Sequence, residues 1–155
     1  MAAGRIYTVV ISGVASPAAA FDFLEAVAAA GKPIRICRIR IAQTSEPTTE
    51  EEQLALTIVR GFTVSGSGGS APTPAPVNPS DAAAGFTAET MNTTQANTSG
   101  TVVFEDAWNT RSGYDMAFAP EEGPGATGGQ RLVIQSSAPA DAVTIRATIW
   151  IEELG

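Results

Sequence analysis

The chain of 155 residues contains no histidine and a single cysteine, Cys37. Without histidine, the Ser-His-Asp and Cys-His catalytic arrangements and the common histidine-based metal sites are excluded. One cysteine cannot form a disulfide within the chain, and the apolar run around Cys37 predicts a small buried side chain rather than a nucleophile. These absences indicate a protein without enzymatic activity, cofactor or metal.

Charge is also scarce. Charged residues make up 16% of the chain, against about 25% in a typical globular protein. Nine basic and 16 acidic residues give a net charge of −7, whereas nucleic-acid binding requires a basic footprint that displaces counterions from phosphate. No apolar run approaches the roughly 20 residues of a membrane span. We therefore expect no nucleic-acid partner, no membrane partner, and a surface of mostly neutral polar residues.

What the chain does have is regular alternation of apolar and polar residues, clearest near the C-terminus. One parity is apolar, with Val143, Ile145, Ala147, Ile149 and Ile151. The other holds Thr144, Arg146, Thr148, Trp150 and Glu152. A period of two predicts a half-buried β-strand, because successive side chains point to opposite faces of a sheet.

Similar patterns predict strands at 5–12, 34–42, 54–64, 86–92, 101–109, 114–119, 131–136 and 142–153. Residues 17–30 are ambiguous: their alanines suit a helix, but Phe21, Phe23 and the turn at 31–33 suit a strand entering a hairpin, which we favour. Many short strands separated by Gly, Pro and Asn predict an all-β fold. We expect one domain over residues 1–155, an antiparallel β-sandwich of jelly-roll type.

The segment IRICRIRIA at 34–42 changes parity: Ile34 and Ile36 share one face, while Cys37 and the later isoleucines share the other. This change indicates a β-bulge or a strand covered on both sides. With uninterrupted alternation, Arg35 would share the Cys37 face, and the arginines at 38 and 40 would continue the Ile34 face. Because an unpaired buried charge is costly, we expect paired or interface-facing arginines.

Two stretches rich in glycine and proline interrupt the strands. Residues 65–85 include Gly66, Gly68 and Gly69 but lack the GxxxxGK[ST] pattern and following helix of a phosphate-binding loop. We expect a long loop there with little regular structure, and a second loop at 120–130; residues 65–80 and 120–130 are candidate contact regions. The polar stretch 43–53 fits either one helical turn, from the capping-box pattern of Thr48 and Glu51, or a solvated acidic loop.

The most plausible anchors for a partner are arginines and tryptophans, which are enriched at binding hot spots. Five residues are candidate subunit or capsid contacts: Arg38, Arg40, Trp108, Arg146 and Trp150. The alternative for both tryptophans is that they cover the rim of the core. A carbohydrate-binding site is a weaker hypothesis, since no cluster of aromatic residues predicts a stacking platform.

The order of these segments resembles that of small head-module structural proteins of tailed bacteriophages. The resemblance extends over almost the whole chain and is most distinctive in SGSGGSAPTPAPVNPSDAAAG (65–85), NTTQ (92–95), APAD (138–141) and IWIEELG (149–155). It implies a capsid decoration, or cement, protein that binds the outer surface of the head, with the major capsid protein and further copies of itself, as a homotrimer, for partners. It also implies a location in the virion after synthesis in the bacterial cytoplasm. A tail, fibre or head-spike component and a carbohydrate-binding β-sandwich are the alternatives.

Overall fold

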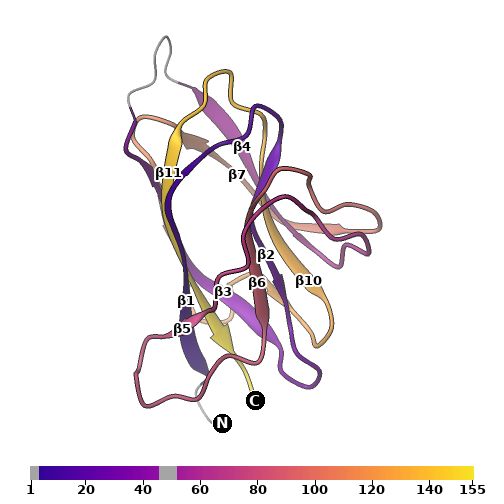
Figure 1. The fold of residues 1–155 in the computed structure, drawn as a ribbon. Coiled ribbons are helices and arrows are strands. Elements are labelled where there is room, and N and C mark those ends of the chain that lie inside the picture. The colour runs from indigo at the N-terminus through magenta and orange to yellow at the C-terminus, as the bar shows by residue number, and fades with distance from the viewer. Residues whose placement is uncertain (1–3, 46–51) are drawn as a thin grey trace.

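The computed structural model describes residues 4–45 and 52–155, and in these ranges the chain forms strands and no helix. Two antiparallel sheets pack face to face, which confirms the predicted β-sandwich (Figure 1). The β1 sheet contains β1 (Arg5–Ala15), β3 (Ile34–Gln43), β5 (Ala75–Pro76), β8 (Tyr114–Ala117), β9 (Gly125–Ala126) and β11 (Thr144–Glu153). The β2 sheet contains β2 (Phe21–Val27), β4 (Gln53–Arg60), β6 (Thr87–Asn92), β7 (Thr101–Asn109) and β10 (Arg131–Ser136).

The strand order is that of a jelly roll. The β1 sheet runs β5-β1-β11-β3-β8, with β9 also paired to β3, and the β2 sheet runs β6-β2-β10-β4-β7. If the short strands β5 and β9 and the edge strand β6 are set aside, successive strands along the chain alternate between the two sheets. The one exception is the pair β4 and β7, which are consecutive and belong to the same sheet. This alternation places the first and last long strands, β1 and β11, side by side in one sheet.

The core lies between the inward faces of the sheets. β11 buries Ile145, Ala147, Ile149 and Ile151 and leaves the residues that alternate with them at least partly exposed, as the period of two predicts. On the facing sheet, Phe21 and Phe23 of β2 meet edge-on with ring centroids 4.8 Å apart. Such edge-to-face pairs add to the free energy gained from apolar burial.

Bulges explain the change of parity in β3. The register to β11 shifts between Trp150 and Ile151, so that Cys37 is the extra residue of β3. All four isoleucines of β3 consequently face the core, while the side chains of Arg35, Arg38 and Arg40 are at least partly exposed. The bulge is confirmed, whereas placing Arg38 and Arg40 on the Ile34 face was wrong, because the inserted residue restores one apolar face.

The segment between β4 and β7, residues 61–100, is ordered by pairing. Residues 61–73 and 93–100, here called the arm, are joined by isolated bridges from Val64 to Asn97 and from Ser67 to Thr94 (Figure 1). Between its two halves, β5 extends the edge of β1 and β6 extends the edge of β2. The prediction that residues 65–85 contain little regular structure is confirmed, since only Ala75–Pro76 form a strand there. The pairing that orders the segment, with partners far along the chain, was not predicted.

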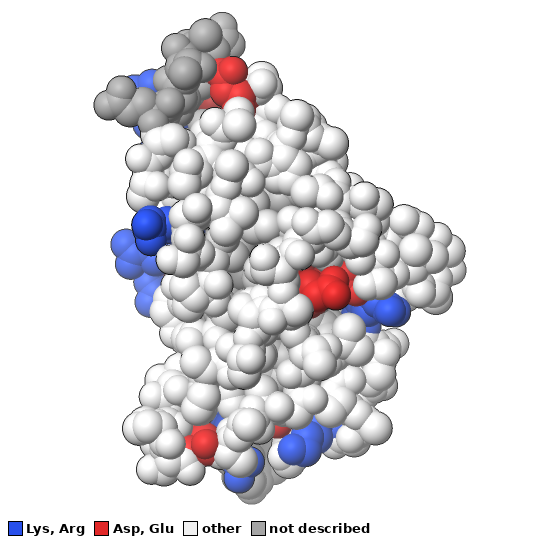
Figure 2. Space-filling view, in the orientation of Figure 1, with Lys and Arg blue, Asp and Glu red and all other residues white. Residues whose placement is uncertain are grey.

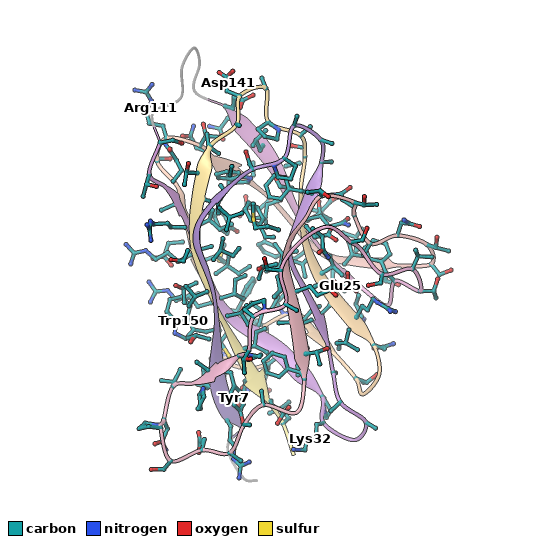
Figure 3. All side chains as sticks on the ribbon, viewed as in Figure 1. Tyr7, Glu25, Lys32, Arg111, Asp141 and Trp150 are labelled. Atoms are coloured by element: carbon teal, nitrogen blue, oxygen red, sulfur yellow. The ribbon has the colours of Figure 1, made fainter. Side chains whose placement is uncertain are left out.

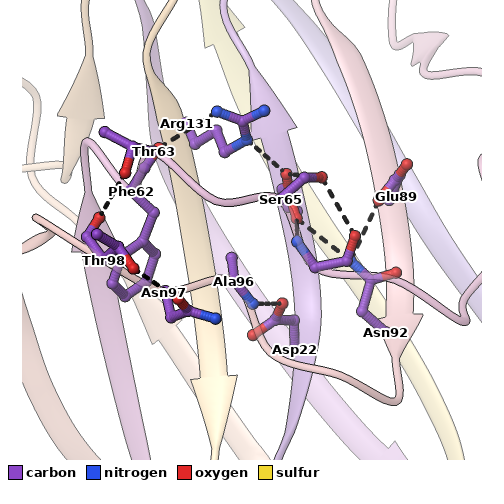
Figure 4. A network of polar contacts seen from close by, with 12 residues as sticks. Asp22, Phe62, Thr63, Ser65, Glu89, Asn92, Ala96, Asn97, Thr98 and Arg131 are labelled. Atoms are coloured by element: carbon purple, nitrogen blue, oxygen red, sulfur yellow. Dashed lines mark hydrogen bonds and ion pairs between the residues drawn. The ribbon is translucent and has the colours of Figure 1, made fainter.

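Glu25 holds the first half of the arm against the β2 sheet (Figure 4). Its carboxylate is 2% exposed and accepts hydrogen bonds from the Ser65 hydroxyl and the Gly66 amide, both at 2.8 Å. It also pairs with Arg131 through Nε at 2.8 Å and accepts a longer bond from the Asn92 side chain. A buried carboxylate with this many donors is well satisfied, so the contact fixes the position of the arm.

Asp22 holds the second half. Its Oδ2 accepts a hydrogen bond from the backbone amide of Ala96 at 2.9 Å, and its Oδ1 accepts one from Nε2 of Gln135 at 2.9 Å. Burial, with a smaller contribution from the charge of Glu25, raises the pKa of Asp22 from 3.8 to about 6, although hydrogen bonds from Ala96, Gln135 and Asn92 oppose the rise.

The glycine run of the arm permits close packing. A Cβ added to Gly66 would lie 2.6 Å from Oδ2 of Asp22, and one added to Gly69 would overlap the carbonyl oxygen of Thr90. Glycine is therefore required where the arm meets the sheet.

The second predicted loop, 120–130, is tied to β3. The Ile36 amide donates to the Pro124 carbonyl at 2.8 Å, and β9 pairs with the start of β3. Residues 48–51, where a capping box was predicted, lie outside the described residues.

Candidate interaction surface

The outward side of β1, β11, β3 and β8, here called the outer face, brings together four of the five predicted anchors. Trp150 of β11 is opposite Arg38 of β3 in the strand register. Arg40 is opposite Thr148, so it is a diagonal neighbour of both Trp150 and Arg146. Figure 2 shows basic side chains on the left flank, at the height at which Figure 3 labels Trp150.

Trp108, the fifth predicted anchor, does not belong to this surface. It is 1% exposed in the core, where its ring meets Phe23 edge-on at a centroid distance of 5.4 Å. Its indole N–H donates to the hydroxyl of Ser136 at 3.1 Å. The prediction of an interface role for Trp108 was wrong, because β7 directs this side chain between the sheets.

Arg38 is fixed from two sides. Its Nε and Nη2 donate to the two oxygens of Asp115 at 2.9 and 2.7 Å, a bidentate pair. Its guanidinium carbon lies 5.4 Å from the centroid of the half-buried Trp150 ring, within cation–π range. The hydrogen bond from Arg38 lowers the pKa of Asp115 below its ordinary range. Trp150 is therefore partly covered by a positive group that is itself neutralised.

Neither Arg40 nor Arg146 has a hydrogen-bonded carboxylate of this kind, although the charge of Arg40 contributes to the lowered pKa of Asp115. By register Arg40 is directly opposite Asp115, but the hydrogen bonds of that carboxylate go to Arg38. The hydrogen bond of Arg146 is to the hydroxyl of Ser12, at 3.4 Å. Both arginines are exposed, and within the described ranges neither donates to a carboxylate.

A shallow groove of about 290 Å³ separates these two side chains, here called the Arg40–Arg146 groove. Its walls include Val10, Ser12 and Thr148 as well as the two arginines. The groove therefore offers two cationic groups, two hydroxyl groups and an exposed aliphatic side chain, a composition suited to a carboxylate on a carbon chain.

Arg35 and Cys37 lie at the β3 bulge. Arg35 donates through Nε to Glu152 at 2.6 Å, and this hydrogen bond raises the pKa of the arginine. The expectation of a paired arginine is thus confirmed at this position. Cys37 is half-buried rather than fully buried, and desolvation raises the pKa of its thiol. A thiol held protonated in this way is a poor nucleophile.

The described residues contain no group of three or more His, Cys, Asp or Glu side chains that could hold a metal ion. The same part of the chain contains no helix of the length and apolar character needed to cross a membrane. Comparison with known protein families, curated proteins and solved structures found no match to this chain.

The alternation placed Thr148 on the same face as Arg146 and Trp150, but the sequence did not single out Asp115 or Ser12 as members of the surface. Their alternation with apolar neighbours was a usable signal, since it places them on the outward side of their strands. Which strands are adjacent, and hence that Asp115 serves Arg38, depends on pairing between segments far apart in the chain.

Proposed function

We propose that this protein is a structural component of a bacteriophage virion, namely a capsid decoration protein that binds the outer surface of the head and stabilises it. The observation that supports the proposal best is the outer face, where Arg38, Arg40, Arg146 and Trp150 are presented together by the paired strands β3 and β11. Arginine and tryptophan dominate binding energy at protein interfaces, and a rigid sheet presents them at little entropic cost.

In this proposal the protein is not an enzyme and uses no cofactor. Its partners are the major capsid protein and further copies of itself in a homotrimer, and it joins the virion after synthesis in the host bacterial cytoplasm. Repeated symmetric attachment would convert modest contacts into high avidity. A jelly roll occurs in proteins of many functions, so the fold does not by itself indicate a phage protein. The phage assignment is supported instead by the resemblance in segment order described above.

A tail, fibre or head-spike role is the second candidate, because the same outer face would suit another virion protein. A carbohydrate-binding role is less well supported. The ring of Trp150 is half-buried and has Arg38 beside it, whereas sugar binding by stacking needs an open aromatic face.

The test is to locate the protein in purified virions by immunogold labelling and cryo-electron microscopy, with mass measurement of the isolated protein. We expect labelling distributed over the head and a trimer in solution. Absence from virions would refute a virion role altogether, while labelling confined to the tail would favour the second candidate. A strict monomer would refute the homotrimer and leave attachment to the head to be judged by the labelling.

A further inference from the structure

Only some of the arginines on the outer face donate a hydrogen bond to a carboxylate. Among the described residues, Arg35 and Arg38 each donate to a carboxylate on an adjacent strand, at 2.6 to 2.9 Å. Arg40 and Arg146 do not, although they are diagonal neighbours on adjacent strands. Diagonal positions are separated by about 7–8 Å, so two guanidinium groups there repel each other unless an anion lies between them.

The charge of the Arg40–Arg146 groove is opposite in sign to the net charge of the protein. The chain carries a net charge of −7, yet the Arg40–Arg146 groove is lined by two cations and by no acidic residue. Both side chains are exposed, so each is free to turn toward a ligand. A carboxylate placed between them could accept charge-assisted hydrogen bonds from both, with the hydroxyls of Ser12 and Thr148 nearby.

We infer that the Arg40–Arg146 groove binds a carboxylate side chain, Asp or Glu, on a partner protein other than a second copy of this chain. The inference rests on the proposed function in one respect: it assigns that carboxylate to the protein of the phage shell. The outer face would thus be the side that attaches to the head.

The strands of a second copy have few carboxylates to offer the groove. Each carboxylate on the described strands accepts a hydrogen bond within its own chain, with the exception of Glu105 on β7. Glu105 is opposite Thr57 and lies on the outward side of the β2 sheet, across the sandwich from the groove. Copies joined through opposite faces would stack head to tail and extend, rather than close into a ring.

The first experiment uses a defined probe, a short glutamate peptide blocked at both ends, titrated into the isotope-labelled full chain at low salt. We expect amide shifts in NMR spectra along β1, β11 and β3 around the groove, and weaker binding as salt increases. The variant Arg40→Gln/Arg146→Gln should lose at least about tenfold in affinity. The matched control Arg5→Gln/Arg60→Gln removes the same charge elsewhere and should bind like the parent protein. Equal affinity of the two double variants, or shifts away from the groove, would overturn the inference.

The second experiment tests whether the partner is the phage shell. Shells assembled without this protein are mixed with the parent, the control variant or the groove variant and then sedimented. Sedimentation of the parent and the control, with loss in Arg40→Gln/Arg146→Gln, supports the inference. If all three sediment equally, the shell contact lies elsewhere and the inference fails while the proposed function stands. If the parent does not sediment, the proposed function and the assigned partner both fail. If the groove variant instead dissociates an oligomer of this chain, the occupant is a second copy and the assignment is overturned.

Discussion

Asp22 couples the arm to pH in the direction opposite to that of a carboxylate whose pKa is lowered by an ion pair. Burial raises its pKa from 3.8 to about 6, although it accepts hydrogen bonds from Ala96 and Gln135. The folded state therefore binds a proton at Asp22 more readily than the unfolded chain does. As the pH falls from 7 toward 4, this proton is taken up first by the folded state, so this group makes the protein more stable. As the pH rises through about 6, that stabilisation is lost.

The size of the effect follows from the two pKa values. Between pH 7 and pH 5, a shift from 3.8 to about 6 contributes about 1 kcal/mol to the free energy of unfolding, with more gained below pH 5. Asp22→Asn removes this titration. The variant also carries a cost that is independent of pH, because its amide group faces one of the two donors, Ala96 N–H or the Gln135 side chain.

The assay is urea unfolding of the parent protein and of Asp22→Asn at pH 7 and pH 5. For each protein we take the change in the free energy of unfolding between pH 7 and pH 5. The difference between these two changes reports on Asp22, because the other carboxylates are present in both proteins. We expect the parent to gain about 1 kcal/mol more than the variant on acidification. Glu105→Gln, which removes an exposed carboxylate on β7, is the matched control. Parallel behaviour of the parent and Asp22→Asn would refute the buried, protonatable state of Asp22.

Three further substitutions test packing and assembly. Trp108→Ala should lower the free energy of unfolding by about 3–5 kcal/mol in urea, because the side chain is 1% exposed; a loss below about 1 kcal/mol would contradict its place in the core. Trp150→Ala should cost less than about 2 kcal/mol in the same assay but reduce binding to shells; a loss of about 3 kcal/mol or more would mean that Trp150 belongs to the core and not to an interface. Gly69→Ala should speed hydrogen exchange at the amides of Ser67 and Thr94, since a Cβ overlaps the carbonyl of Thr90; unchanged exchange would show that the arm is not closely packed there.

Local alternation accounts for the parts of the fold that the sequence predicted. The last strand, β11, shows an unbroken period of two, so its buried and outward residues were assigned correctly. The parity change at Cys37 predicted a bulge. β2 has the same signature, with Phe21 and Phe23 followed by Leu24 and Ala26, and its register to β10 also shifts. A parity change within an apolar strand is thus a usable sign of a bulge.

The missed features depend on partners distant in sequence. The arm is glycine- and serine-rich, a composition typical of flexible segments, yet Glu25 bonds to Ser65 and Gly66, about 40 residues further along the chain. No local pattern shows that a carboxylate in a strand will meet those donors. Trp108 was misassigned for a related reason: an edge strand such as β7 is exposed along much of its length, and only the partner sheet shows which end is covered.

The arm also bears on which side of the sandwich can meet a partner. On the β2 sheet, Val59 and Val133 are 3% and 0% exposed although they lie outside the main core. Gly100 of the arm lies against both Val59 and Phe62, so the chain covers part of this side with its own residues. On the β1 sheet, Val10 remains 51% exposed beside two arginines that donate no hydrogen bond to a carboxylate of the described chain. Val102 on β7 is 52% exposed, so aliphatic surface remains on both sheets. The two arginines, rather than the valine, are therefore the feature that favours the β1 sheet as the side that attaches to a partner.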